Sequence, residues 1–214
     1  GNQRVVNSTV DMGPYEFQGT PTPQYGSVTV YDTSNTPIGS YTTIQEGITA
    51  CLGSGTVVVQ SGTYTETITI NKYITVTGTG ATQPVIAGSS PVVTFEGVGA
   101  GGTLTGFTIQ GGSGVDGYGI WCKNGATPVI TSNTIKDNSQ YGICCHNSSP
   151  TITNIIISEN SSNGIYCDNS SPVVTNNTIS GNNCGICYYN HSSPTITNNT
   201  ISGNSNMGIY CDNS

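Results

Sequence analysis

The sequence predicts an all-β protein: a right-handed parallel β-helix of three-sided, 22-residue coils, preceded by a short capping helix. First, a phrase recurs at a constant step of 22, marked by Pro128, Pro150, Pro172 and Pro194. Second, each repeat holds three short alternating runs, separated by turn formers such as "DNSSP", "NN" and "GNN". Third, the repeats are rich in Asn, Ser, Thr and Gly and poor in Leu, which excludes helical arrays and leucine-rich horseshoes.

Within a coil, the alternation predicts an inward column of Ile165, Cys167, Val174 and Ile179 and their equivalents. The third turn predicts a ladder of side-chain amides along the stack, formed by Asn138, Asn160, Asn182 and Asn204. One repeat position predicts a buried ladder of small residues, formed by Cys122, Cys145, Cys167 and Cys211. A disulfide among these four and a local one between Cys184 and Cys187 both stay open.

The earlier half is less regular. Ile44, Ile48, Cys51 and Leu52 are expected on one face of a short helix that covers the open end of the stack. Strands are expected at 56–60, 63–70, 73–77, 92–95 and 104–109, with loops at 97–102 and 111–117. The predicted organisation is an N-terminal segment (1–23), the helix with irregular coils (24–118), and regular repeats whose last coil is incomplete (119–214).

The composition limits the partners. Among 214 residues, four basic and eleven acidic ones give a net charge of −7, and only 7% are charged. Without a Lys/Arg cluster to neutralise phosphates, nucleic acid is not expected as a partner. No apolar run reaches the roughly 18–20 residues of a membrane span, so membrane insertion is not expected. Eight cysteines and few lysines favour an extracellular or cell-surface location.

Two segments resemble known families. The expected helix, the run "SGTYTETITINKYITVTGTG" and the repeats, roughly residues 38–214, resemble the pectin-lyase-like β-helix superfamily, above all its non-enzymatic surface proteins built of parallel β-helix repeats. The stretch "GNQRVVNSTVDMGPYEFQ" at 1–18 resembles the segment that closes the β-helix in choice-of-anchor bacterial surface proteins. There it follows the coils, whereas here it precedes them.

Three explanations of this order stay open. The segment belongs to a preceding unit of a tandem array, or it completes the unfinished last coil of a neighbouring copy, or the chain is a truncated piece of something longer, as the absence of a signal peptide and of an initiating Met indicates. We favour the second, a head-to-tail homopolymer joined through strand addition. The candidate assembly residues are Val5, Val6, Val10, Tyr15, Phe17, Ile209, Tyr210 and Cys211.

Catalysis is not expected. Enzymes of the superfamily act on acidic polysaccharides with clustered carboxylates, bound Ca²⁺ or a basic residue. The only arginine, Arg4, precedes the coils. The acids of the regular repeats are interpreted as occupying no equivalent positions in neighbouring coils: Asp137, Glu159, Asp168 and Asp212. The sequence therefore predicts a structural protein without cofactors.

Three alternative sites remain. Carbohydrate binding by a domain of a larger surface protein, with a polysaccharide as partner, is the main alternative, along the aromatic column of Trp121, Tyr166 and Tyr210; polysaccharide processing is its weaker form. A weak metal candidate, Cys144 with His146 and Asp168, competes with a solvated turn column. That column is predicted four residues before each proline and comprises Asn124, His146, Asp168, Asn190 and Asp212. An ice-binding face is the third alternative, in the outward column of Thr131, Thr153, Thr175 and Thr197.

Overall fold

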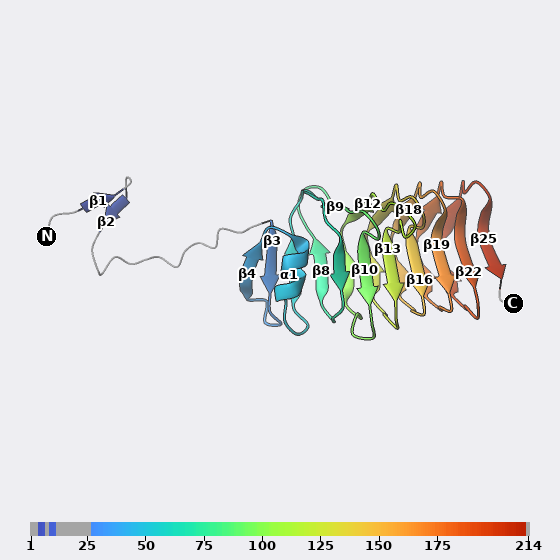
Figure 1. The fold of residues 1–214 in the computed structure, drawn as a ribbon, viewed down its shortest axis with the longest axis horizontal. Helices are drawn as coiled ribbons and strands as arrows, with labels where there is room; N and C mark the ends of the chain where they lie inside the picture. Colours follow the sequence, from blue (N-terminus) through green and yellow to red (C-terminus); the bar gives the residue numbers. More distant parts are fainter. Residues whose placement is uncertain (1–3, 7–8, 12–26, 213–214) are drawn as a thin grey trace.

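The computed structural model describes residues 4–6, 9–11 and 27–212. Within them it shows a right-handed parallel β-helix of about 7 turns with 22-residue coils, as predicted (Figure 1). Two short strands, β1 (Arg4–Val6) and β2 (Thr9–Asp11), pair antiparallel with Val5 opposite Val10. Two of the candidate assembly residues, Tyr15 and Phe17, lie outside the described residues.

The coils are built from three sheets, which the chain visits in turn. Sheet I comprises β7 (Ile68–Ile70), β10 (Val93–Glu96), β13 (Ile120–Lys123), β16 (Ile143–His146), β19 (Asn163–Asp168), β22 (Cys184–Tyr189) and β25 (Met207–Asp212). Sheet II comprises β4 (Pro37–Tyr41), β3 (Val28–Tyr31), β5 (Thr56–Val59), β8 (Thr75–Gly78), β11 (Thr103–Thr105), β14 (Val129–Thr131), β17 (Thr151–Thr153), β20 (Val173–Thr175) and β23 (Thr195–Thr197). Sheet III comprises β6 (Thr63–Tyr64), β9 (Val85–Ala87), β12 (Thr108–Gln110), β15 (Thr134–Lys136), β18 (Ile156–Ser158), β21 (Thr178–Ser180) and β24 (Thr200–Ser202).

A helix and a hairpin close the N-terminal end of the stack. The helix α1 (Ile44–Ala50) begins with a capping box between Thr43 and Glu46 and packs against β3, β4, β5 and β7. Its first two free N–H groups donate to the Glu66 carboxylate, at 2.9 and 3.0 Å. The predicted cap is thus present, but Cys51 and Leu52 both lie beyond its last residue, Ala50; Cys51 is buried as expected, whereas Leu52 is 74% exposed.

The predicted strands differ from the observed ones mainly at the corners, where the chain turns from one sheet to the next. The runs at 63–70 and 104–109 each contain two strands, because the chain turns between sheets within them. In the second run the corner is Gly106, whose φ of 83° lies in the left-handed region. The strands β3, β4 and β9 were not predicted, because they are short or belong to the antiparallel closure.

The inward column is confirmed. Ile165, Cys167, Val174 and Ile179 are all fully buried. Cys122, Cys145 and Cys167 are in register on neighbouring strands as free, buried thiols. Tyr188 interrupts this column, and Cys211 beyond it is exposed, contrary to the predicted burial. Among the described residues no further coil covers it.

The recurring Gly-Ile pairs have a steric cause. A Cβ on Gly142, Gly164 or Gly185 would lie 2.7, 2.7 and 2.4 Å from the carbonyl oxygen of the equivalent glycine one coil further on. The isoleucine that follows points inward and is fully buried, as at Ile143 and Ile165. A glycine is therefore required wherever the coils approach this closely.

Candidate functional site

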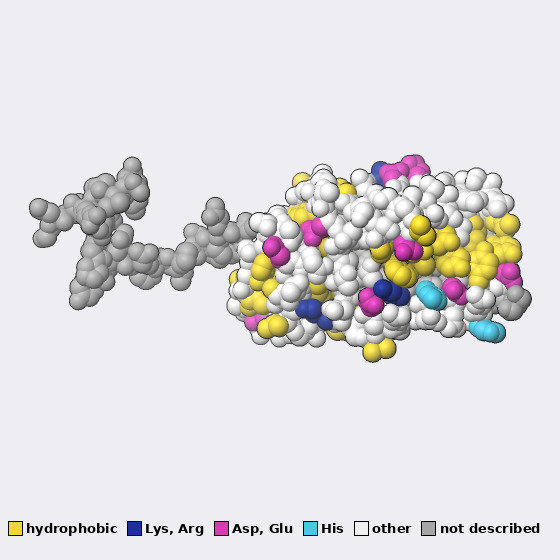
Figure 2. Space-filling model, in the orientation of Figure 1, with side chains coloured by type: hydrophobic (Ala, Val, Ile, Leu, Met, Phe, Trp, Pro, Cys, Tyr) yellow, Lys and Arg dark blue, Asp and Glu magenta, His cyan; other side chains and the backbone are white. Residues whose placement is uncertain are grey.

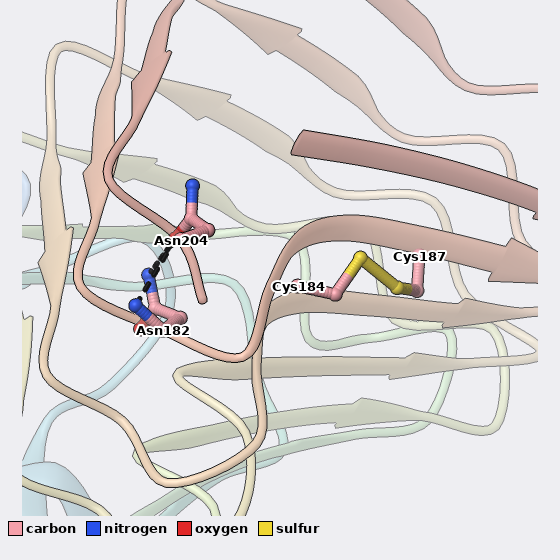
Figure 3. The surroundings of a disulfide bond; sticks show 4 residues. All are labelled: Asn182, Cys184, Cys187 and Asn204. Atoms are coloured by element: carbon pink, nitrogen blue, oxygen red, sulfur yellow. Dashed lines mark hydrogen bonds between the residues drawn. A yellow bond between two sulfur atoms is a disulfide. The ribbon is translucent and has the colours of Figure 1, made fainter. Parts of the chain in front are cut away.

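The corners of the coil carry hydrogen-bonded ladders. A residue with positive φ, such as Asp137, Glu159 or Gly181, makes the turn, and the next residue points inward. At the third turn, between sheets III and I, Nδ2 of each Asn donates to Oδ1 of the next, at 2.8 Å for Asn138 to Asn160 and 3.0 Å for Asn160 to Asn182. Figure 3 shows the last of these bonds, from Asn182 to Asn204 at 3.1 Å. The predicted asparagine ladder is confirmed.

Two further corner ladders were missed. At the first turn, the N–H of Ser148 donates to Oγ of Ser170, and the N–H of Ser170 to Oγ of Ser192, at 3.1 and 3.0 Å. At the second turn, Nδ2 of Asn177 donates to Oδ1 of Asn199 at 2.9 Å. The 22-residue spacing of these residues was the signal that could have found them.

The outer face of sheet I carries a tyrosine stack, formed by Tyr118, Tyr141, Tyr166, Tyr189 and Tyr210. Successive ring centroids lie 5.2, 4.6, 5.2 and 5.6 Å apart. Figure 2 shows hydrophobic side chains gathered over the C-terminal half of this face. The predicted aromatic column of Trp121, Tyr166 and Tyr210 shares one register position, where these rings alternate with Cys144 and Cys187. The stack also contains Tyr118, Tyr141 and Tyr189, which the sequence analysis did not predict to lie beside this column.

The rings shield one another from water. Tyr141 and Tyr166 lie 3° from parallel, so each covers a face of the other, and Tyr189 lies over the other face of Tyr166. Burial, followed by the charge of Asp168, raises the pKa of Tyr166 to about 12. At the N-terminal end of the stack, the rings of Trp121 and Tyr118 pack edge to face. The Lys123 ammonium lies 4.4 Å from the centre of the Trp121 ring. The stack therefore offers mainly ring edges to the solvent.

A pocket of about 260 Å³ opens where the stack reaches its C-terminal strands. Its lining includes Cys184 and Cys187, which form a disulfide within β22 (Figure 3). Tyr189 and Tyr210 contribute rings, and the amides of Asn163, Asn183 and Asn206 contribute polar groups. The local bridge that the sequence left open is thus present, beside a recess with both apolar and hydrogen-bonding walls.

The metal candidate does not assemble into a ligand set. His146 Nε2 and Asp168 Oδ2 pair at 3.7 Å, and Nδ2 of Asn190 donates to Asp168 at 2.7 Å. Among the described residues, no three His, Cys, Asp or Glu side chains gather as metal ligands, so Cys144 does not complete the set. The composition of the predicted turn column is also wrong. Lys123, not Asn124, is in register with His146, and Tyr189, not Asn190, is in register with Asp168. The reason is one extra residue in the turn that follows Lys123 and in the turn that follows Tyr189, compared with the turns after His146 and Asp168.

The acids need one correction. Lys136 is in register with Ser158, so the next residues, Asp137 and Glu159, are equivalent positions in neighbouring coils. Both are exposed turn residues with positive φ, and Asp137 pairs with Lys136 at 3.0 Å. The sequence already contained this equivalence, because Asp137 follows Pro128 at the same distance as Glu159 follows Pro150, and the sequence interpretation overlooked it.

The outward threonine column lies in sheet II, with Thr131, Thr153, Thr175 and Thr197 in register. Oγ1 of Thr197 donates to Oγ1 of Thr175 at 3.2 Å. The arrangement of this face is therefore as expected, while ice binding stays a prediction.

The last described coil presents an apolar end face, formed by Ile196, Ile201, Met207 and Ile209. Ile209 is 49% exposed, whereas its register partner Ile186 is fully buried. The equivalent groups of earlier coils, such as Ile186, are covered by the coil that follows.

The geometry defines a class of protein, a ladder-stabilised parallel β-helix. A family model described as a right-handed β-helix region matches residues 97–214, more than half of the chain, and the chain belongs to this family. Neither the curated proteins nor the solved structures give a match. In the described part of the chain, no helix is long and apolar enough to cross a membrane.

Proposed function

We propose that this protein is a non-catalytic structural β-helix of the cell surface or extracellular space, a stiff rod that associates end to end with another β-helical coil. The observation that carries the proposal is the apolar end face, whose isoleucines repeat the column that is buried in every earlier regular coil. A strand set with free edge groups is a natural template for another chain.

The ladders support the mechanical part of the proposal. Every regular coil is joined to the next by three parallel sheets, by the corner ladders and by the tyrosine stack. Bending such a rod would have to lengthen the hydrogen bonds of the sheets and ladders and the ring contacts of the stack together, so we expect it to resist bending. The Cys184–Cys187 disulfide favours an oxidising compartment, in line with the proposed location.

The test compares two isoleucines that are equally exposed, at 49%, on different faces. Ile209 lies on the end face, and Ile156 lies on the flank in β18. We expect Ile209→Asp to abolish association, seen by sedimentation velocity and negative-stain electron microscopy over a dilution series, while Ile156→Asp leaves it intact. Short separate rods of the unaltered protein at every concentration would contradict the proposal.

Deleting residues 1–18 tests how the ends meet. If this segment completes a neighbouring coil, the deletion removes association and leaves the circular dichroism of the coils unchanged. Unchanged association after the deletion disposes of strand donation by this segment, and the end face then meets another surface of its neighbour.

A second candidate function is carbohydrate binding, favoured by the pocket beside the disulfide. Tyr189 and Tyr210 supply rings for stacking on a sugar, and the amides of Asn163, Asn183 and Asn206 suit its hydroxyl groups. Affinity electrophoresis in gels that contain a neutral polysaccharide tests this. We expect the polysaccharide to retard the unaltered protein and Asn183→Ala to abolish this retardation. Ser202→Ala, which alters an exposed residue of sheet III away from the pocket, should be retarded like the unaltered protein. No retardation of the unaltered protein would reject carbohydrate binding.

A further inference from the structure

Two rings of the tyrosine stack are placed for a reaction with each other. Tyr141 and Tyr166 lie face to face, with centroids 4.6 Å apart and planes 3° from parallel. Tyr118 and Tyr141 are also parallel, at 5.2 Å and 5°. Towards the C-terminus the rings tilt, by 32° between Tyr166 and Tyr189 and by 50° between Tyr189 and Tyr210. The closest and most parallel pair is therefore Tyr141 with Tyr166.

Both rings of this pair are partly open to the solvent. Tyr118 donates its hydroxyl hydrogen to Asp116 at 3.2 Å, whereas the hydroxyls of Tyr141 and Tyr166 have no hydrogen-bond partner among the residues that the structure describes. The proton that each phenol loses on oxidation therefore passes to the solvent.

We propose that Tyr141 and Tyr166 form an oxidative cross-linking site, at which a haem peroxidase with hydrogen peroxide, or another one-electron oxidant, joins the two rings as dityrosine. Each phenol loses one electron and one proton to give a phenoxyl radical. The two ortho carbons form a C–C bond, and the hydrogen on each moves to the phenolic oxygen as the rings become aromatic again. The two electrons and two protons removed reduce one hydrogen peroxide to two water molecules.

The coils hold the reactants in place for this step. Tyr166 lies in β19, and Tyr141 lies two residues before β16, its neighbour in sheet I. Because the backbone fixes both rings before oxidation, coupling within one molecule outcompetes the encounter of two molecules. A phenol is neutral near pH 7, and burial raises the pKa of Tyr141 and Tyr166 further, so each loses its proton together with the electron.

The product would be a covalent bond between neighbouring coils. It goes beyond the proposed structural function, because it needs no end-to-end association and occurs in a single molecule. Cys144 is in register with Tyr166 and is the nearest competing group, since a thiol can reduce a phenoxyl radical. We therefore expect Cys144→Ser to increase the yield of dityrosine.

The experiment oxidises dilute protein with a haem peroxidase and hydrogen peroxide, and in parallel with a small ruthenium photo-oxidant and persulfate, which reaches rings that an enzyme cannot. Proteolysis and mass spectrometry then search for the peptides of Tyr141 and Tyr166 joined with the loss of two hydrogen atoms. We expect this linked pair, with dityrosine fluorescence, in protein that remains monomeric on a denaturing gel.

Two variants give the comparison. Tyr166→Phe should lose the linked pair, whereas Tyr73→Phe, which alters a 64% exposed tyrosine outside the stack, should keep it. The proposal is overturned if both oxidants give no dityrosine, only bonds between molecules, or only a Tyr–Cys thioether at Cys144. If Tyr166→Phe does not fold, the peptide map of the unaltered protein still decides between these outcomes.

Discussion

Nδ2 of Asn160 donates a 3.0 Å hydrogen bond to Oδ1 of Asn182, one coil further along the axis. The same Nδ2 also lies within hydrogen-bond distance of the carbonyls of Ile135 and Ser158, and Oδ1 of Asn160 accepts from Asn138. One buried amide thus joins three coils and satisfies backbone groups that the corner would otherwise leave without partners.

Removing this amide should therefore be costly. Asn160→Ala leaves buried donors and acceptors unsatisfied on both sides, and we expect the free energy of unfolding to fall by about 2–3 kcal/mol. Urea denaturation followed by circular dichroism measures it. The matched control is Ser161→Ala at the next, exposed residue, and equal losses for the two variants would contradict the role of the ladder.

The adjacent residues Ile156 and Ile157 test the direction of the strand. Ile157 is fully buried and Ile156 is 49% exposed on the opposite face of β18. We expect Ile157→Ala to cost about 3 kcal/mol through the cavity it leaves, and Ile156→Ala about 0.5 kcal/mol or less. Denaturation midpoints of the two variants decide; a larger loss for Ile156→Ala would mean that the register is inverted.

Two glycines separate close approach from backbone strain. A Cβ on Gly164 would lie 2.7 Å from the carbonyl oxygen of Gly185, whereas a Cβ on Gly203 meets nothing within 4 Å, and the φ of Gly203 is 61°. We expect Gly164→Ala to destabilise by about 3 kcal/mol, because the coils must move apart. Gly203→Ala should cost about 1 kcal/mol from left-handed strain alone. Thermal unfolding would refute the explanation if the order were reversed.

Alkaline pH should loosen the tyrosine stack. Burial raises the pKa of Tyr166 to about 12 and also raises that of Tyr141, above the usual value near 10 in the unfolded chain. The contribution of the neutral rings to stability is therefore complete below about pH 10 and is lost as the pH rises towards 12. Absorbance titration of tyrosinate and unfolding experiments between these limits measure it.

A variant isolates this effect. Tyr166→Phe cannot ionise, so its stability should fall less steeply above pH 10 than that of the unaltered protein. Tyr73→Phe, outside the stack, should follow the unaltered protein. Parallel slopes for all three proteins would show that the stack does not carry the alkaline transition.

The sequence by itself determined the coil. A step of 22 residues, three alternating runs and an Asn at the third turn of each coil predicted the sheets, the inward column and the asparagine ladder, because stacked equivalent residues make the same contacts in every coil. These contacts are local along the axis, so a periodic pattern contains them. The cap helix followed from the spacing of Ile44 and Ile48 for the same reason.

Only the tertiary structure decided which side chains from non-equivalent positions of the repeat come into contact. The stacked rings come from different positions of the repeat, so Tyr141 meets Tyr166 although the two are 25 residues apart and not equivalent. Insertions of one residue at the corners moved Asn124 and Asn190 out of the column of His146 and Asp168. Ring orientation, the disulfide within β22 and the pocket beside it depend on side-chain rotamers and on the path of the chain at each corner, and a repeat period does not specify either.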